Sequence, residues 1–190
     1  MLAFHDIKIL HLLHRIPFRA YNLLDMPIFD NQSMEFISRH ADQTRRLGVR
    51  LGLMLQVGDL IGLEGELGSG KTTLVQGIVS GWGSPDLVTS PSFVLVNVYQ
   101  HPQGQRLYHV DAYRLANAAE AEDLDIFGML ESSVVVIEWA DRIRTILPKE
   151  NFWINMHWVA EDQRDMLFHA SGERYLLLLN ELRHQIYGVS

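Results

Sequence analysis

Eight consecutive residues fit the phosphate-binding pattern G-x-x-x-x-G-K-[ST], and they read Gly65-Glu66-Leu67-Gly68-Ser69-Gly70-Lys71-Thr72. Glycines in such a loop let the backbone wrap tightly around a phosphate, with its N–H groups pointing inward. Lys71 would then reach the β- and γ-phosphates, and the Thr72 hydroxyl would hold Mg²⁺. The pattern therefore predicts a site for a nucleotide with its metal ion.

The residues around this loop match the structural context that the motif requires. Residues 59–64 read as a short buried strand, and residues 72–80 read as the first turns of a helix. The positive end of the helix dipole would add to the attraction for phosphate. A chance match is the alternative, and four fixed positions recur by chance in roughly one chain of this length in a hundred. The strand and the helix favour the nucleotide site.

Two carboxylates at predicted strand ends are candidates for the chemistry. Glu138 ends the most hydrophobic predicted strand, where an acid linked to Mg²⁺ belongs, although Asp is more usual there. The alternative for Glu138 is an ordinary exposed strand-end acid. Asp111 ends another apolar strand, and two roles stay open for it: assisting the metal or the nucleophile, or capping the following turn.

Two further features near these carboxylates have both a functional and a structural interpretation. The hydroxyl-rich loop of Ser90, Pro91 and Ser92 would sense the γ-phosphate, or it is a plain turn. Trp139 directly follows Glu138, and an aromatic residue in that place is more often packed than functional.

The remaining pattern predicts an α/β domain with a mixed sheet and helices on both faces. Ser33 is expected to cap a helix whose apolar positions include Phe36 and Ile37. Strands are predicted over 93–99, 106–111, 133–138, 152–159 and 166–170, the first two as a hairpin and the last two as antiparallel strands. Helices are predicted over 118–124, 141–146 and 173–187.

Composition limits the class of protein. The 190 residues are 47% hydrophobic and 21% charged, with a net charge of −7 and no cysteine. The missing basic excess argues against unaided binding to nucleic acid, and no run is long enough for a membrane span. Arg39, Arg45, Arg46 and Arg50 form a local basic cluster, which we interpret as a solvated helix face in preference to a contact for RNA or a partner. We expect a cytoplasmic protein.

The chain divides into two parts by pattern. Residues 1–32 read as a poorly anchored extension, with prolines and turn-forming residues, and a start codon assigned too early is an alternative because Met26 and Met34 follow. Residues 33–190 read as the nucleotide-binding domain.

Several motifs together resemble the bacterial TsaE (YjeE) proteins over about residues 33–160. They are Gly65 to Thr73, Ser90-Pro91-Ser92-Phe93, Tyr108-His109-Val110-Asp111-Ala112-Tyr113-Arg114 and Ile137-Glu138-Trp139, in the order and spacing of that family. The phosphate loop is shared by many proteins, whereas H-x-D-x-Y-R followed by E-W is far more selective.

The resemblance implies a P-loop ATPase that uses ATP and Mg²⁺ to support threonylcarbamoylation of the adenosine beside the anticodon in ANN-decoding tRNAs. Its partners would be TsaD and TsaB, with tRNA reached through that complex. By matching position, Lys71 and Thr72 contact phosphate and Mg²⁺, Glu138 is linked to Mg²⁺, and Asp111 lies in the catalytic site. Trp139 contributes to activity or partner contact, and the loop with Ser90 and Ser92 responds to nucleotide.

The ATPase is expected to be slow alone, because no arginine finger is evident near the loop. Either Arg114 supplies that charge in cis or a partner supplies it. The rival function is a small-molecule kinase, but the residues between Glu138 and Phe152 leave little material for the lid that such kinases close over ATP.

Overall fold

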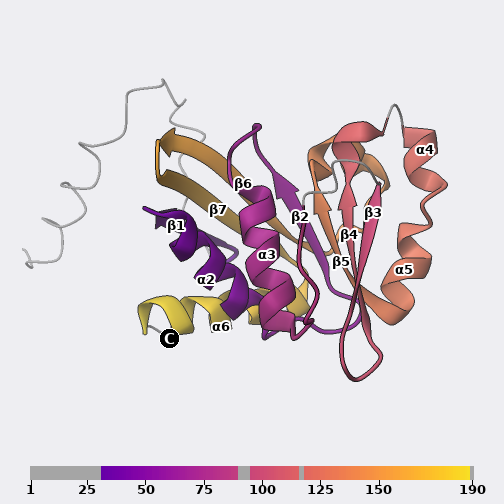
Figure 1. Cartoon of the computed structure of the whole chain (residues 1–190), viewed down its shortest axis with the longest axis horizontal. Helices are drawn as coiled ribbons and strands as arrows, with labels where there is room; N and C mark the ends of the chain where they lie inside the picture. Colours follow the sequence, from indigo (N-terminus) through magenta and orange to yellow (C-terminus); the bar gives the residue numbers. More distant parts are fainter. Residues whose placement is uncertain (1–30, 90–94, 116–117, 189–190) are drawn as a thin grey trace, which may run out of the picture. The chain divides into compact units, whose positions relative to one another are not determined.

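The computed structural model describes residues 31–89, 95–115 and 118–188, which form a seven-stranded sheet with helices on both faces (Figure 1). The strands are β1 (Ser33–Ser38), β2 (Leu60–Glu64), β3 (Val96–Gln100), β4 (Arg106–Asp111), β5 (Ser133–Glu138), β6 (Asn151–Ala160) and β7 (Gln163–Ser171). The helices are α2 (Ala41–Gly52), α3 (Lys71–Trp82), α4 (Ala118–Glu122), α5 (Ile126–Ser132) and α6 (Glu173–Tyr187), and two 3₁₀ segments are η2 (Ala112–Arg114) and η3 (Ala140–Ile146). None of the described helices combines the length and hydrophobicity needed to cross a membrane.

The sheet is mixed, as the sequence predicted, with the order β1-β7-β6-β2-β5-β4-β3. Its centre is parallel: β2 pairs with β5 and β6, and β4 pairs with β5. The two edges are antiparallel. At one edge β3 pairs with β4, and at the other edge β7 pairs with β6 and β1 pairs with β7. Every residue of β5 is buried, which explains its uninterrupted apolar sequence.

One expectation about the helices is wrong. The segment after Ser33 is the edge strand β1 and not a helix, because its backbone pairs with β7. Helix α2 begins only at Ala41, where the His40 ring accepts a hydrogen bond from the Asp42 N–H. Short-range pattern could not reveal this, since the partner strand lies about 130 residues away in the sequence.

The predicted acidic helix over 118–124 is also shorter than expected and is followed by a second helix. Helix α4 ends at Glu122, and Asp125 then caps α5 by accepting a hydrogen bond from the Gly128 N–H at 3.1 Å. The proposed extension over residues 1–32 falls almost entirely outside the described residues, as does the loop of Ser90, Pro91 and Ser92.

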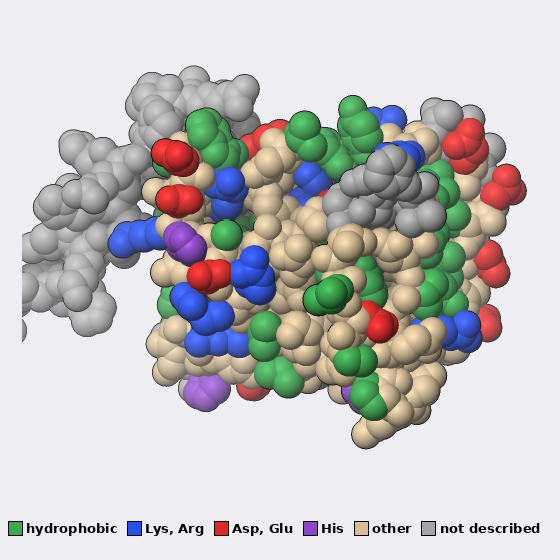
Figure 2. Space-filling model, in the orientation of Figure 1, with side chains coloured by type: hydrophobic (Ala, Val, Ile, Leu, Met, Phe, Trp, Pro, Cys, Tyr) green, Lys and Arg blue, Asp and Glu red, His purple; other side chains and the backbone are tan. Residues whose placement is uncertain are grey.

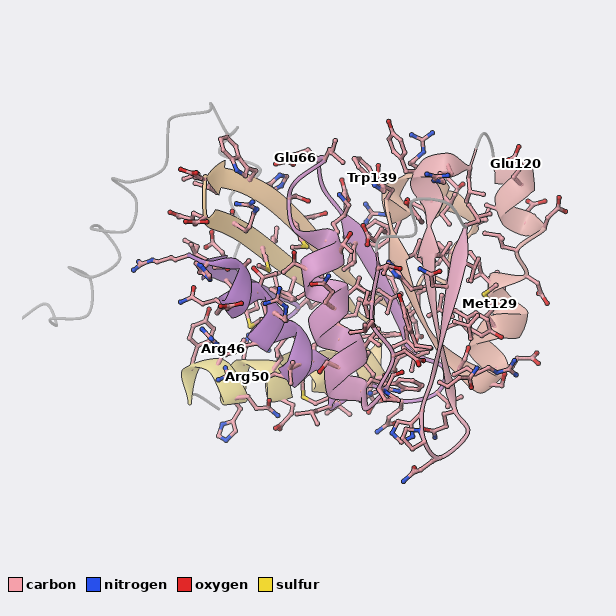
Figure 3. All side chains as sticks on the ribbon, in the orientation of Figure 1. Arg46, Arg50, Glu66, Glu120, Met129 and Trp139 are labelled. Atoms are coloured by element: carbon pink, nitrogen blue, oxygen red, sulfur yellow. The ribbon has the colours of Figure 1, made fainter. Side chains whose placement is uncertain are left out.

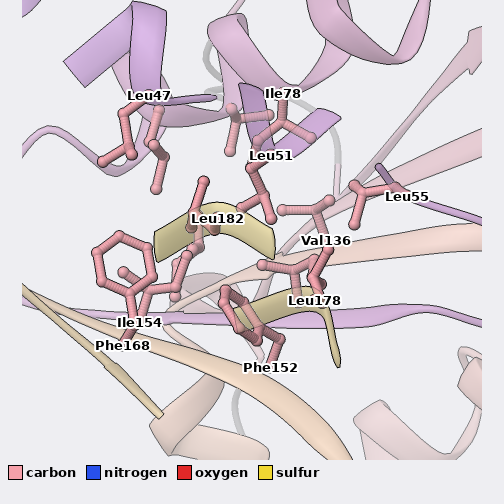
Figure 4. Close-up of a cluster of buried hydrophobic side chains, with 14 of the residues drawn as sticks. Leu47, Leu51, Leu55, Ile78, Val136, Phe152, Ile154, Phe168, Leu178 and Leu182 are labelled. Atoms are coloured by element: carbon pink, nitrogen blue, oxygen red, sulfur yellow. The ribbon is translucent and has the colours of Figure 1, made fainter. Parts of the chain in front are cut away.

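Two hydrophobic cores lie on opposite faces of the sheet. The larger core joins α2, α3 and α6 to one face, and Leu51, Ile78, Phe152, Phe168 and Leu178 are among its fully buried side chains (Figure 4). The smaller core lies under α4, α5 and η3. Alternate side chains of β5 enter the two cores, so this strand is held from both sides.

Helices α2 and α3 approach closely because glycines form their contact. Gly48 and Gly52 of α2 face Gly77 and Gly81 of α3, and each helix carries its pair four residues apart. A Cβ atom on Gly77 would lie 2.1 Å from the Arg45 carbonyl oxygen, which is a severe overlap. The glycines therefore set the position of α3, whose first turn belongs to the phosphate loop.

We predict that Gly77→Ala destabilises the protein although alanine is the better helix former. The gain in helix propensity is about 1 kcal/mol, whereas overpacking a close backbone contact costs about 1–3 kcal/mol and forces the helices apart. Urea unfolding of the variant should show a lower midpoint. Ser80→Ala on the exposed face of the same helix is the control and should keep the wild-type midpoint, and equal midpoints for both variants would contradict the role of the glycine contact.

Candidate nucleotide-binding site

The phosphate loop connects β2 to α3 at the carboxyl edge of the parallel strands. Gly70 precedes the helix with a φ of 96°, a left-handed conformation that glycine adopts without strain. Gly65 has a φ of 148°, and a Cβ atom there would lie 2.1 Å from the Met156 carbonyl oxygen. The two glycines are therefore required by backbone conformation and by close packing against β6.

Lys71 is buried at the centre of this loop. Its Nζ donates hydrogen bonds to the carbonyl oxygens of Gly65 at 2.7 Å and Glu66 at 3.0 Å, and it lies 3.9 Å from the centre of the Trp139 ring. Burial lowers the pKa of Lys71, and the neighbouring carboxylate of Glu138 opposes that shift. The ammonium group is thus held inside the loop, where little water competes for an incoming phosphate.

Glu138 meets the first turn of α3. The Thr72 hydroxyl donates to the Glu138 carboxylate, with its oxygen 2.9 Å from Oε1 and 3.2 Å from Oε2. The same carboxylate contacts Nε2 of His109 at 2.9 Å, and both side chains are buried. Parallel pairing sets His109 beside Val136, so the His109 and Glu138 side chains are diagonal neighbours on the face that α3 covers. Glu138 is therefore not an ordinary exposed strand-end acid.

Asp111 lies next to Glu138 in the register of β4 and β5. One of its carboxylate oxygens accepts a hydrogen bond from the Tyr113 N–H at 3.1 Å, so Asp111 does cap the turn into η2. Burial, and secondarily the negative charge of Glu138, raise the pKa of Asp111. The capping bond uses one oxygen only, so a second role at the site is compatible with it.

The Trp139 ring lies at the site, next to the Lys71 ammonium, and also packs against the smaller core (Figure 3). Its backbone has a φ of 58°, a left-handed conformation that is unusual for a bulky residue. Its ring contacts the Tyr113 ring, with centres 4.9 Å apart, in addition to the Lys71 ammonium. Strained backbone of this kind is concentrated at functional sites.

Sequence reasoning missed two contacts that support the loop from the β6–β7 hairpin. The Glu66 carboxylate accepts a hydrogen bond from the Trp158 N–H at 2.6 Å. Arg164 of β7 donates from Nε to the Gly68 carbonyl oxygen at 3.1 Å, and its guanidinium also bonds three carbonyls of the hairpin turn. Nothing in the local pattern signals Arg164, because it lies 96 residues from Gly68.

The oxygen atoms at the site suit a magnesium ion. Mg²⁺ prefers hard oxygen ligands, and it usually takes one or two from the protein and others from substrate phosphates and water. The Thr72 hydroxyl and the Glu138 carboxylate are such a pair and already touch each other. The described residues contain no group of three or more His, Cys, Asp or Glu side chains that could hold a metal ion by themselves.

A phosphate loop between a parallel strand and a helix, with a buried lysine and a facing acid, defines a nucleotide-binding α/β protein of the P-loop class. Residues 38–166 match the family described as threonylcarbamoyl adenosine biosynthesis protein TsaE. The chain belongs to this TsaE family.

Curated relatives agree with this assignment. The "tRNA threonylcarbamoyladenosine biosynthesis protein TsaE" of Streptomyces coelicolor is 42% identical over 139 residues, covering 69% of this chain and 93% of the relative. The protein of the same name from Bacillus subtilis is 35% identical over 145 residues, covering 75% and 90%. The crystal structure of Bacillus subtilis YdiB superposes with a TM-score of 0.70 at 29% identity, covering 81% of this chain and 96% of that one.

We predict that Arg164→Gln weakens nucleotide binding although Arg164 does not belong to the loop motif. Loss of a charge-assisted hydrogen bond to the loop backbone costs about 1.5 kcal/mol, which corresponds to roughly tenfold in affinity. Titration with a fluorescent ATP analogue measures the effect. Arg106→Gln, an exposed arginine on β4, is the matched control and should bind as the wild type does, so equal affinities for both variants would show that the hairpin does not support the loop.

Proposed function

We propose that this chain binds ATP with Mg²⁺ and hydrolyses it to ADP and phosphate in the service of tRNA threonylcarbamoyladenosine synthesis. The observation that carries the proposal is the contact between the Thr72 hydroxyl and the buried Glu138 carboxylate, whose charge also acts on the Lys71 ammonium. These groups match a metal-linked acid, a metal-linked hydroxyl and a phosphate-binding cation. The printed names of the relatives connect the family to this tRNA modification.

Each residue then has a role that follows from its surroundings. The loop N–H groups and Lys71 bind the phosphates, and Thr72 and Glu138 hold the metal, which when bound neutralises charge on the β- and γ-phosphates. His109 is a positioning residue, because its buried ring fixes the orientation of the Glu138 carboxylate. Asp111 orients the attacking water, and Trp139 covers the Lys71 ammonium beside it.

Free turnover is slow under this proposal, because the positive charge that stabilises the transferring phosphoryl group has to come either from Arg114, which lies near Asp111, or from a partner. Arg164 is bonded to backbone carbonyls, and Arg142 lies over the Tyr113 ring at 5.4 Å and bonds the Leu115 carbonyl. A partner that inserts a positive charge would accelerate hydrolysis. We propose the TsaD–TsaB complex as that partner, with tRNA bound by the complex.

A small-molecule kinase is the alternative function, and the structure offers little support for it. Such enzymes close a lid over ATP to exclude water. Between β5 and β6 the chain forms only the short 3₁₀ segment η3 and its flanking turns. ADP production without any added acceptor supports the ATPase, whereas production only with a small acceptor supports the kinase.

Two substitutions separate binding from hydrolysis. Lys71→Ala should abolish measurable ATP binding, because the cation inside the loop is lost, while Lys149→Ala at an exposed lysine should change nothing. Glu138→Gln should keep ATP affinity within a few-fold but lower phosphate release by about 100-fold, since it removes the charge next to the metal. Nucleotide titration and a phosphate-release assay measure the two effects.

The same assay with TsaD, TsaB and tRNA added tests the partner proposal. Stimulation of the wild type but not of Glu138→Gln is the expected result. Wild-type turnover by Lys71→Ala would overturn the site assignment, and unchanged turnover on adding the complex would overturn the partner proposal.

A further inference from the structure

A groove outside the nucleotide site is lined by three arginines and a partly apolar floor. It runs between the end of β1 and helix α2 and has a volume of about 400 Å³. Phe36, Ile37 and Leu47 form the floor, and Arg39, Gln43, Arg46 and Arg50 complete the lining. Figure 2 shows the Lys and Arg side chains gathered over α2, and Figure 3 places Arg46 and Arg50 well away from Trp139 of the nucleotide site.

The groove is a built feature, because hydrogen bonds fix the turn between its two sides. The buried Ser38 hydroxyl donates to the His40 carbonyl oxygen at 2.9 Å and accepts from the Thr44 hydroxyl at 2.8 Å. The Gln43 side chain accepts a hydrogen bond from the Arg39 N–H at 2.7 Å. The arginines are therefore mounted on a rigid turn and helix.

The charges of the groove are not neutralised within the described part of the chain. The guanidinium groups of Arg39, Arg46 and Arg50 have no hydrogen-bond or ion-pair partner among the described residues, and no acidic residue lines the groove. Arg45 on the same helix differs, because it pairs with Asp42. In a chain with a net charge of −7, this concentration of unpaired positive charge indicates an anionic ligand.

The open edge of β1 is not the binding feature. The carbonyl oxygens of Ser33 and Glu35 point away from β7 and accept hydrogen bonds from the Arg183 and Tyr187 side chains of α6. These contacts block the first part of the edge, so an added peptide strand would find its partners occupied. Recognition therefore rests on the side chains that line the groove and not on an added strand.

The geometry points to the phosphate backbone of an RNA strand as the ligand of this groove. Arg46 and Arg50 are one helical turn apart, about 6 Å along the axis, which is comparable to the separation of successive phosphates on an RNA strand. Guanidinium groups bind phosphate through paired N–H donors, and the apolar floor and half-buried Phe36 suit the edge or face of an unstacked base. The relatives are named for tRNA threonylcarbamoyladenosine biosynthesis, so an RNA is present in the reaction of the family. The RNA site does not depend on ATP hydrolysis.

Three phosphate contacts give a weak and salt-dependent interaction. For a single strand, the logarithm of the binding constant should fall with the logarithm of salt concentration with a slope of about −2. The acidic remainder of the chain lowers the affinity further, so binding is to be measured at low salt.

The test is fluorescence anisotropy of a labelled tRNA transcript titrated with the full chain. The Arg46→Gln/Arg50→Gln double variant should bind at least tenfold more weakly than the wild type, and its salt slope should be shallower by about 1.4. Arg45→Gln removes one charge from the same helix outside the groove and should bind within twofold of the wild type. All three proteins should bind ATP equally, which separates this test from the proposed ATPase.

Three outcomes would overturn the proposal. If the double variant bound tRNA as tightly as the wild type does, the groove would not be part of the interaction. A comparable loss in Arg45→Gln would show that net charge alone is responsible. If polyglutamate displaced the labelled tRNA as effectively as a single-stranded RNA of equal charge does, the groove would instead be a site for an acidic protein surface. Equal circular dichroism spectra and melting curves exclude misfolding as the cause of a loss.

Discussion

The pairing of Thr72 with Glu138 depends on the parallel register of β2 and β5, and the rest of the site is arranged around it. Leu63 lies opposite Glu138, so the carboxylate emerges beside the strand that leads into the phosphate loop. In the first turn of helix α3, the hydroxyl of Thr72 then reaches that carboxylate. A shift of one residue in β5 would turn Glu138 to the opposite face of the sheet. Such a shift would separate the Glu138 carboxylate from the Thr72 hydroxyl and from the buried His109 ring, so these contacts favour the observed register.

The charged side chains of Lys71 and Glu138 can be buried here because neighbouring groups replace the water that they lose. Lys71 and Glu138 are both buried, and an isolated ion in such a place would cost several kcal/mol. The carbonyl oxygens of the loop, the Trp139 ring and the His109 ring satisfy these groups. An arriving nucleotide and its metal therefore meet donors and acceptors that are already oriented, which reduces the reorganisation that binding requires.

Two structural supports hold the loop from opposite ends. Glycine contacts let α2 press directly on α3 and so set the helix that begins at Lys71. The β6–β7 hairpin holds the opposite side through the Trp158 N–H and Arg164. The hairpin also carries exposed side chains of Trp158 and Val159, so a molecule that moved the hairpin would also act on the phosphate loop.

The sequence by itself determined the phosphate loop, the buried strand that ends at Glu138, the β3–β4 hairpin and the family, because each is written in contiguous residues with a strong local pattern. Only the tertiary structure decided that the segment after Ser33 is an edge strand, that His109 orients Glu138 and that Arg164 supports the loop. These features arise from pairing between strands and from contacts between residues that are far apart in the sequence. Local propensity carries no information about such partners, and the same holds for the groove, which forms only because β1 and α2 meet.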